Sequence, residues 1–139
     1  MNIARKTALE VVEKYGNGLQ GILDAEGVQI IYFALAGRLK ELYFGDFIIL
    51  KSGLPEAERH ELIAHALGHH FLHAGNHFFV STSDTNPWDK LQERQAEVFA
   101  AYLLMPKVNN LSVQEIANSF TVTEKFASFR LKLLKAYKQ

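Results

Sequence analysis

Residues 28–52 carry the pattern that most narrows the folds open to this chain. The stretches VQIIYFAL, LKELYF and GDFIILK are rich in β-branched and aromatic residues, and Gly37 and the pair Gly45-Asp46 interrupt them. Apolar runs of this kind between glycine-containing breaks are typical of short strands. We therefore predict a small sheet of about three strands, the last two of which form a hairpin.

Helical patterns flank this stretch on both sides. Residues 3–15 carry apolar side chains at helical spacing, and Gly16 is placed to end that helix. Pro55 and the acids after it suit a first helical turn and predict a helix that runs to about residue 73. The apolar stripe of this helix, expected to face the core, consists of Ile63, Leu67 and Phe71. Residues 74–86 are expected to form a loop.

The last third of the chain predicts further helices. Asn86 is a candidate cap, Pro87 suits the first position of a helix, and Pro106 is placed to end it. The sequences SVQE at 112–115 and TVTE at 121–124 have the form of capping boxes, which predicts a short helix and then a final one. Strands gathered early and helices gathered late predict an α+β fold.

Charge and composition exclude several classes of protein. The net charge is zero, so no global attraction to nucleic acid or to an anionic membrane is expected. Without cysteine, the chain can form neither a disulfide framework nor a thiolate metal site. No signal peptide or membrane span is recognisable, and no linker or repeat divides the chain. We expect a single cytoplasmic domain over residues 1–139.

The histidines are the first sign of chemistry, because all six lie between residues 60 and 77. His65 and His69 are four apart, so on a helix they share one face about 6 Å apart along the axis and can converge on one ion. Gly68 between them leaves room for a close approach. His73 continues that face about 12 Å from His65, too far to share the ion, so it is expected to contact a ligand or to face the substrate.

A histidine pair at this spacing is a weak signal alone, because it also occurs by chance on surface helices. The next predicted helix adds Glu93 and Glu97, which are again four apart on one face. One carboxylate could bind the ion while the other accepts a hydrogen bond from a ligating imidazole. Taken singly, either acid is better explained as part of a solvated face paired with Lys90 and Arg94. The combination with the histidine pair favours a metal site.

The sequence ERHELIAHALGHHFLH at 58–73, followed by ERQAEVFAAYLLMP at 93–106, resembles the ImmA/IrrE family of zinc metallopeptidases. The family pattern is a His-Glu-x-x-His helix that commonly ends in Leu-His, and then a helix that ends in Leu-Leu-Met-Pro. The resemblance implies a small zincin-like domain with a C-terminal helical pair, and a zinc ion held by His65, His69 and Glu93. It implies that Glu97 is the acid hydrogen-bonded to a ligand. Manganese or iron would also suit such a ligand set.

Ala66 departs from the family pattern. The family has a glutamate here, the general base that takes a proton from the attacking water. Alanine accepts no proton, and losing a positioned base typically costs about 10²–10⁴ in rate, so we expect this chain to be inactive. Ala66 is either an engineered Glu-to-Ala change or the natural residue of a zinc-binding pseudo-protease with a regulatory role. We favour the first, because the other motif residues are intact, and we expect position 66 to face a wet cleft.

The resemblance also implies a partner, since family members resemble regulatory proteases that cut helix-turn-helix repressors of mobile elements or stress responses. The hairpin strand GDFIILK could present an edge that binds the substrate as an added strand. An alternative is that residues 113–138 are themselves a DNA-binding helix-turn-helix with a basic second helix. The apolar residues of that helix indicate packing instead, so direct binding to nucleic acid is the less favoured interpretation. These apolar residues are Phe126, Phe129, Leu133 and Leu134.

Overall fold

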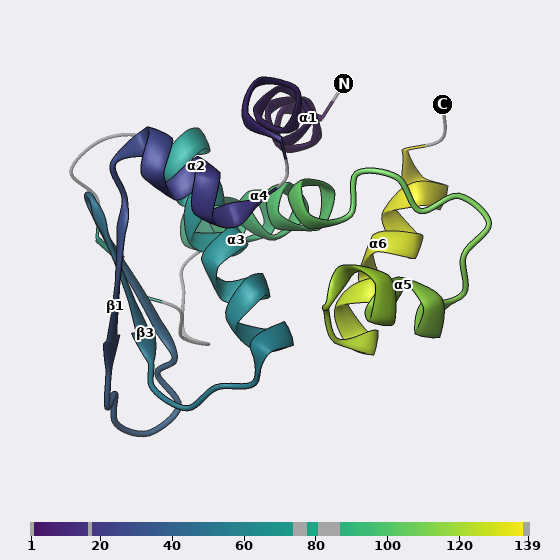
Figure 1. Ribbon diagram of the computed structural model, residues 1–139. Helices are drawn as coiled ribbons and strands as arrows, with labels where there is room; N and C mark the ends of the chain where they lie inside the picture. Colours follow the sequence, from purple (N-terminus) through teal and green to yellow (C-terminus); the bar gives the residue numbers. More distant parts are fainter. Residues whose placement is uncertain (1, 17, 74–77, 81–86, 138–139) are drawn as a thin grey trace.

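The computed structural model describes residues 2–16, 18–73, 78–80 and 87–137. These residues form six helices and one four-stranded sheet, and Figure 1 shows the helices gathered on one face of the sheet. The predicted α+β class is confirmed. Among the described residues, no helix combines the length and the apolar character needed to cross a lipid bilayer.

The first half of the chain contributes two helices and the central strands. They are α1 (Ile3–Tyr15), α2 (Leu19–Glu26), β1 (Gln29–Phe33), β2 (Glu41–Phe44) and β3 (Phe47–Lys51). The side chain of Asn2 caps α1 by accepting a hydrogen bond from the Arg5 N–H at 3.1 Å, and α1 ends at Gly16 as predicted. Helix α2 was not predicted from the sequence.

The sheet has the strand order β1-β3-β2-β4, which includes a strand that was not predicted. Strands β2 and β3 form the expected antiparallel hairpin, and Gly45 at its turn has a φ of 58°, which favours glycine. The fourth strand, β4 (Phe78–Val80), pairs with β2 inside the segment expected to be a loop. Three residues are too few to show an alternating pattern, so only the pairing with β2 reveals this strand. The rest of 74–86 lies outside the described residues.

Strand β3 is not available to bind a substrate as an added strand, contrary to the expectation for GDFIILK. It pairs in parallel with β1 on one side and antiparallel with β2 on the other. Both of its hydrogen-bonding edges are therefore occupied inside the sheet. The edge strands are β1 and β4.

The two helices that carry the motif are α3 (Glu56–Leu72) and α4 (Pro87–Leu104), close to their predicted bounds. Pro55 is the N-cap residue of α3, directly before the first helical turn, and makes no side-chain capping hydrogen bond. The expected cap of α4, Asn86, lies outside the described residues. The predicted stripe of α3 faces the core, because Ile63 and Leu67 are buried and Phe71 stacks on Phe99 with ring centroids 5.7 Å apart. Helices α3 and α4 thus pack face to face through apolar side chains.

The chain ends in the predicted helical pair, α5 (Val113–Phe120) and α6 (Glu124–Ala136). The capping box of α5 is confirmed, since the Ser112 hydroxyl accepts from the Glu115 N–H at 3.1 Å and the Glu115 carboxylate accepts from the Ser112 N–H at 2.8 Å. The box predicted at Thr121 is wrong. Thr121 ends α5 with a φ of 53°, where the chain reverses, and Thr123 caps α6.

The helical pair is fixed to the domain by the buried side chain of Arg130. Its guanidinium donates to the carbonyl oxygens of Met105 at 2.7 Å and Pro106 at 3.1 Å, just after α4 ends. One of the basic residues of the candidate DNA-binding helix is therefore used inside the protein. This arrangement favours a packing role for α6 over one in DNA recognition.

Candidate metal centre

The close contact between α3 and α4 depends on Gly68. A Cβ added to this glycine would lie 2.8 Å from the Cα of Ala96 and 2.9 Å from its carbonyl oxygen, both of which are backbone atoms. No other residue fits without moving one helix away from the other. The predicted close approach at Gly68 is therefore that of α4, which brings Glu93, one turn before Ala96, next to the histidines of α3.

Replacing Gly68 with alanine is expected to lower the free energy of unfolding by about 1–3 kcal/mol, the usual cost of overpacking a core. Gly21→Ala is the matched control, because Gly21 lies inside α2 with nothing within 4 Å of an added Cβ. That change should stabilise the fold by up to about 1 kcal/mol. Urea unfolding of both variants tests the difference. A Gly68→Ala protein as stable as the parent would show that the two helices can separate at little cost.

The three predicted ligands converge in the structure. The Nε2 of His65 lies 3.1 Å from Glu93 Oε2, and the Nε2 of His69 lies 2.6 Å from Glu93 Oε1. One ligand atom from each residue lies within 4.8 Å of the others, so this group could hold a metal ion. Ligands of a tetrahedral zinc ion are about 3.3 Å apart for bonds of about 2.0–2.1 Å, so the donors need only small movements. Two imidazoles and one carboxylate also match a catalytic zinc set, which leaves one position open.

The protonated form of His65 and the ionised form of Glu93 stabilise each other. Burial lowers the pKa of His65, but the carboxylates of Glu41 and Glu93 outweigh this effect and raise the pKa to about 10. Burial raises the pKa of Glu93, but hydrogen bonds and charge from His65 and His69 outweigh it and lower the pKa to about 2. The cluster is thus built to hold positive charge between carboxylates. A bound cation would take the place of the proton, so metal binding should release protons.

Glu41 is a functional candidate that the sequence analysis missed. It lies on β2 with 1% of its surface exposed, and its two carboxylate oxygens are 3.1 and 3.3 Å from the Nδ1 of His65. By accepting the Nδ1 hydrogen, Glu41 leaves Nε2, 3.1 Å from Glu93 Oε2, as the nitrogen of His65 that would bind an ion in place of a proton. The available signal was alternation in the strand ELYF, which places Glu41 on the same face as the buried Tyr43. A charged residue at an inward strand position needs a partner.

Glu97 does not occupy the place expected for it. Its side chain is exposed, and in the described part of the chain no hydrogen bond joins it to His65 or His69. It instead lines a hollow of about 230 Å³ beside His65 and Glu93, together with Glu61. The structure therefore places Glu41, and not Glu97, against the imidazole of the candidate ligand His65.

His73 contacts the buried imidazole of His69. A contact with a candidate ligand was one of the two roles expected for His73. The Nδ1 atoms of the two histidines are 3.0 Å apart, and the Nε2 of His73 lies 2.8 Å from the amide oxygen Oε1 of Gln95. An amide oxygen only accepts, so His73 donates from Nε2 and, when neutral, accepts at Nδ1. Burial lowers the pKa of His73, which favours that neutral form. His69 then donates from Nδ1, which leaves its Nε2, 2.6 Å from Glu93 Oε1, as the nitrogen that would bind the metal.

Ala66 is fully buried and belongs to the hydrophobic core. The expectation that this position faces a wet cleft is therefore wrong. Ala66 therefore lies beneath neighbouring side chains of the core, one position after His65 on α3.

His70 is also held by hydrogen bonds, but outside the candidate centre. Its Nδ1 lies 2.8 Å from the hydroxyl of Tyr43, and its Nε2 lies 2.9 Å from the carboxylate of Glu26. The hydroxyl of Tyr15 donates to the same carboxylate at 2.7 Å. These contacts join α1, α2, α3 and β2, so His70 has a structural role in tying the elements of the domain together.

A peptidase family model, described as the IrrE N-terminal-like domain, matches residues 23–132 of the chain. The match covers more than half of the chain and includes both helices of the centre. No curated protein matches the chain.

Proposed function

Because the chain belongs to the IrrE N-terminal-like peptidase family, we propose that it is a zinc-binding regulatory endopeptidase domain directed at a helix-turn-helix transcriptional repressor. The observation that carries the proposal is the convergence of His65, His69 and Glu93 across the contact of α3 with α4. Two histidines from one helix and a carboxylate from the next form a ligand set typical of zinc peptidases.

Each polar residue of the centre has a defined part in this proposal. His65, His69 and Glu93 hold the ion, while Glu41 and His73 fix the orientation and hydrogen placement of the two imidazoles. Bound zinc would supply a Lewis acid that polarises the peptide carbonyl. Ala66 takes no proton from the attacking water, so the chain is proposed to bind its substrate without cutting it.

The repressor is proposed as substrate on the strength of the family resemblance. The LLMP ending of α4 and the Leu-His ending of α3 support that resemblance beyond the ligands themselves. The hollow beside His65 and Glu93 offers room for part of a bound polypeptide next to the proposed ion. The domain would thus act on repressors of mobile elements or stress responses.

Elemental analysis of the purified chain tests the metal part of the proposal. We expect about one zinc per chain, because Ala66 removes no ligand. Free zinc at 100 times its dissociation constant should raise the free energy of unfolding by about 2.7 kcal/mol. The variant with both His65 and His69 changed to alanine is the control and should lose both effects. Stoichiometric zinc in that variant would place the ion elsewhere.

A further inference from the structure

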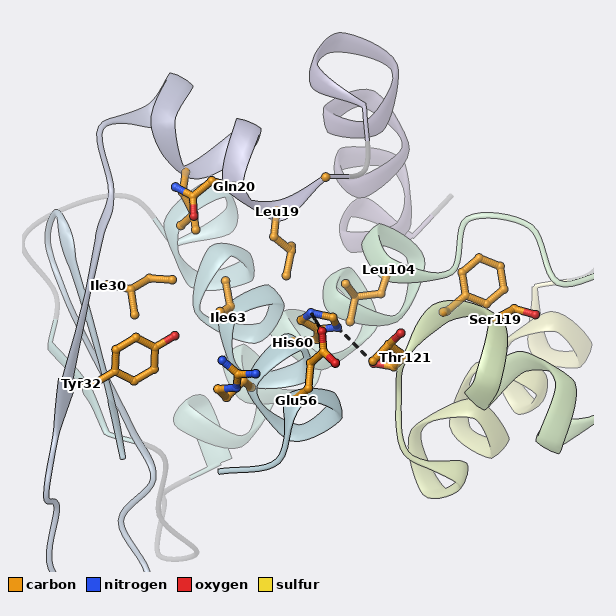
Figure 2. Close-up of a pocket in the computed structure, with 14 residues that line it drawn as sticks. Leu19, Gln20, Ile30, Tyr32, Glu56, His60, Ile63, Leu104, Ser119 and Thr121 are labelled. Carbon is orange, nitrogen blue, oxygen red and sulfur yellow. Dashed lines mark hydrogen bonds and ion pairs between the residues drawn. The ribbon is translucent and has the colours of Figure 1, made fainter. Parts of the chain in front are cut away.

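A cavity of about 580 Å³ lies on the side of α3 turned away from the candidate metal centre. The α3 residues that line it include Arg59, His60 and Ile63, which point away from His65 because a helix turns about 100° per residue. The other walls come from α2, β1, the end of α4 and the turn after α5 (Figure 2). This volume falls within the range of small-molecule sites.

Much of the cavity wall is apolar. Figure 2 shows Leu19 of α2 and Ile30 of β1 pointing into the cavity, with Ile63 of α3 between them. The remaining apolar contributions are Leu23, Leu104 and Phe120. A ligand that fills this space would therefore need an apolar body.

Arg59 supplies a cation to the lining of this cavity. Its Nε is buried and has no hydrogen-bond partner among the described residues. Among the described residues no ion pair joins Arg59 to the acids beside it, since the exposed Glu56 lies 3.8 Å from His60 and Glu58 pairs with Lys40. A buried donor without an acceptor is unfavourable, and a carboxylate would satisfy it through the fork geometry that guanidinium groups favour.

The charge balance of the lining favours a ligand with one negative charge. No lysine contributes to the described lining, so Arg59 is its one permanent cation, and no carboxylate of the described residues forms an ion pair with it. We propose that the cavity binds a small organic monoanion, a carboxylate with an apolar chain or ring. The carboxylate would lie on Arg59, and the apolar part would lie between Leu19, Ile30 and Ile63.

The cavity shares a wall with the hollow of the candidate metal centre. The turn between α5 and α6 lines the cavity through Thr121, and this turn is tied to α3 at two adjacent residues. His60 Nδ1 lies 3.2 Å from the carbonyl oxygen of Thr121, and the Glu61 carboxylate accepts from the Thr123 N–H at 2.6 Å. Glu61 and Phe126, which follows the turn, line the hollow on the other side. Binding in the cavity should therefore also perturb the backbone from Thr121 to Phe126.

The test uses a matched pair of probes, hexanoate and hexanamide, which share a chain and differ in charge. Backbone amide shifts of the ¹⁵N-labelled chain are followed by NMR up to about 10 mM probe, which reveals even a millimolar dissociation constant. Hexanoate should shift the amides of Ile30, Arg59, Ile63 and Thr121, and hexanamide should bind at least about 10-fold more weakly. A short apolar peptide, with its C-terminus free or amidated, distinguishes a peptide terminus from a free carboxylic acid as the source of the carboxylate.

Two variants locate the binding. Arg59→Gln should abolish the hexanoate shifts, while Arg38→Gln, the same charge change at an exposed position outside the cavity, should leave them unchanged. Equal binding of hexanoate and hexanamide, shifts confined to other surfaces, or no shift with any probe would overturn the proposal. So would a folded Arg59→Gln protein that binds hexanoate as the parent does. If that variant does not fold, the comparison of the two probes on the parent chain decides.

Discussion

Glu93→Ala is expected to abolish tight zinc binding. Glu93 supplies the one carboxylate of the candidate ligand set, and it lies within 3.1 Å of the Nε2 of each histidine. Without it, the site keeps only the two imidazoles of α3, one protein ligand fewer than a catalytic zinc site has. The loss should exceed the roughly 10–100-fold effect of removing a residue that only orients a ligand.

Glu41→Gln should give that intermediate effect, a loss of about 10–100-fold in zinc affinity. Glutamine keeps the size of the buried side chain but removes the charge that faces the Nδ1 of His65. Glu97→Ala is the matched control and should change the affinity little, because the exposed Glu97 carboxylate touches neither imidazole in the described structure. Competition with a chromophoric chelator measures the zinc affinity of the Glu93→Ala, Glu41→Gln and Glu97→Ala variants. A larger loss for Glu97→Ala than for Glu41→Gln would restore the role that the family resemblance implies for Glu97.

Site residues that lie on the same face of one helix could be predicted from the sequence. The hydrogen bond and the strand pairing that join separate elements could not. The four-residue spacing of His65 and His69 was sufficient to place two ligands together, and Glu93 followed from the motif of the next helix. The hydrogen bond from His65 to Glu41 joins residues 24 positions apart, so it depends on how β2 packs against α3. Strand β4 was missed for the same reason, because its three residues are recognisable only through their pairing with β2.

Two prolines explain why the starts of α3 and α4 could be predicted. Pro55 and Pro87 mark the starts of α3 and α4 through local backbone restrictions, which act whatever the rest of the fold does. Thr121 shows the limit of such local rules. Both Thr121 and Thr123 can cap a helix, and the choice between them follows from the reversal of the chain after α5.

Ala66→Glu is expected to have the largest effect on activity, a gain of about 10²–10⁴ in the rate of repressor cleavage. The change adds the missing proton acceptor directly after His65. The burial of Ala66 adds a cost that the sequence did not indicate, because a carboxylate at a fully buried position must find a hydrogen-bond partner or expose itself. We expect the variant to lose on the order of 3 kcal/mol of stability while it remains folded in the presence of zinc.

Ala66→Gln is the matched control, since glutamine brings the same bulk and a similar burial cost but accepts no proton from water. Both variants and the parent chain are incubated with candidate repressors from the same genome, and intact-mass spectrometry detects cleavage. Ala66→Glu alone should cut, and a chelator should stop it. Cleavage by the parent chain would mean that another carboxylate acts as the base, and Glu61 and Glu97 line the hollow beside His65.

The two explanations of Ala66 predict different results for a folded, zinc-loaded Ala66→Glu protein that binds a repressor. An engineered Glu-to-Ala change leaves a site shaped for the glutamate, so the carboxylate should be accommodated and cleavage should return. A natural pseudo-protease has no such constraint, and its core can close over position 66, as the complete burial of Ala66 illustrates. In that case the variant should bind the repressor and leave it whole, which would make the chain a zinc-dependent binding module. Alanine at this position in the native gene would independently favour that outcome.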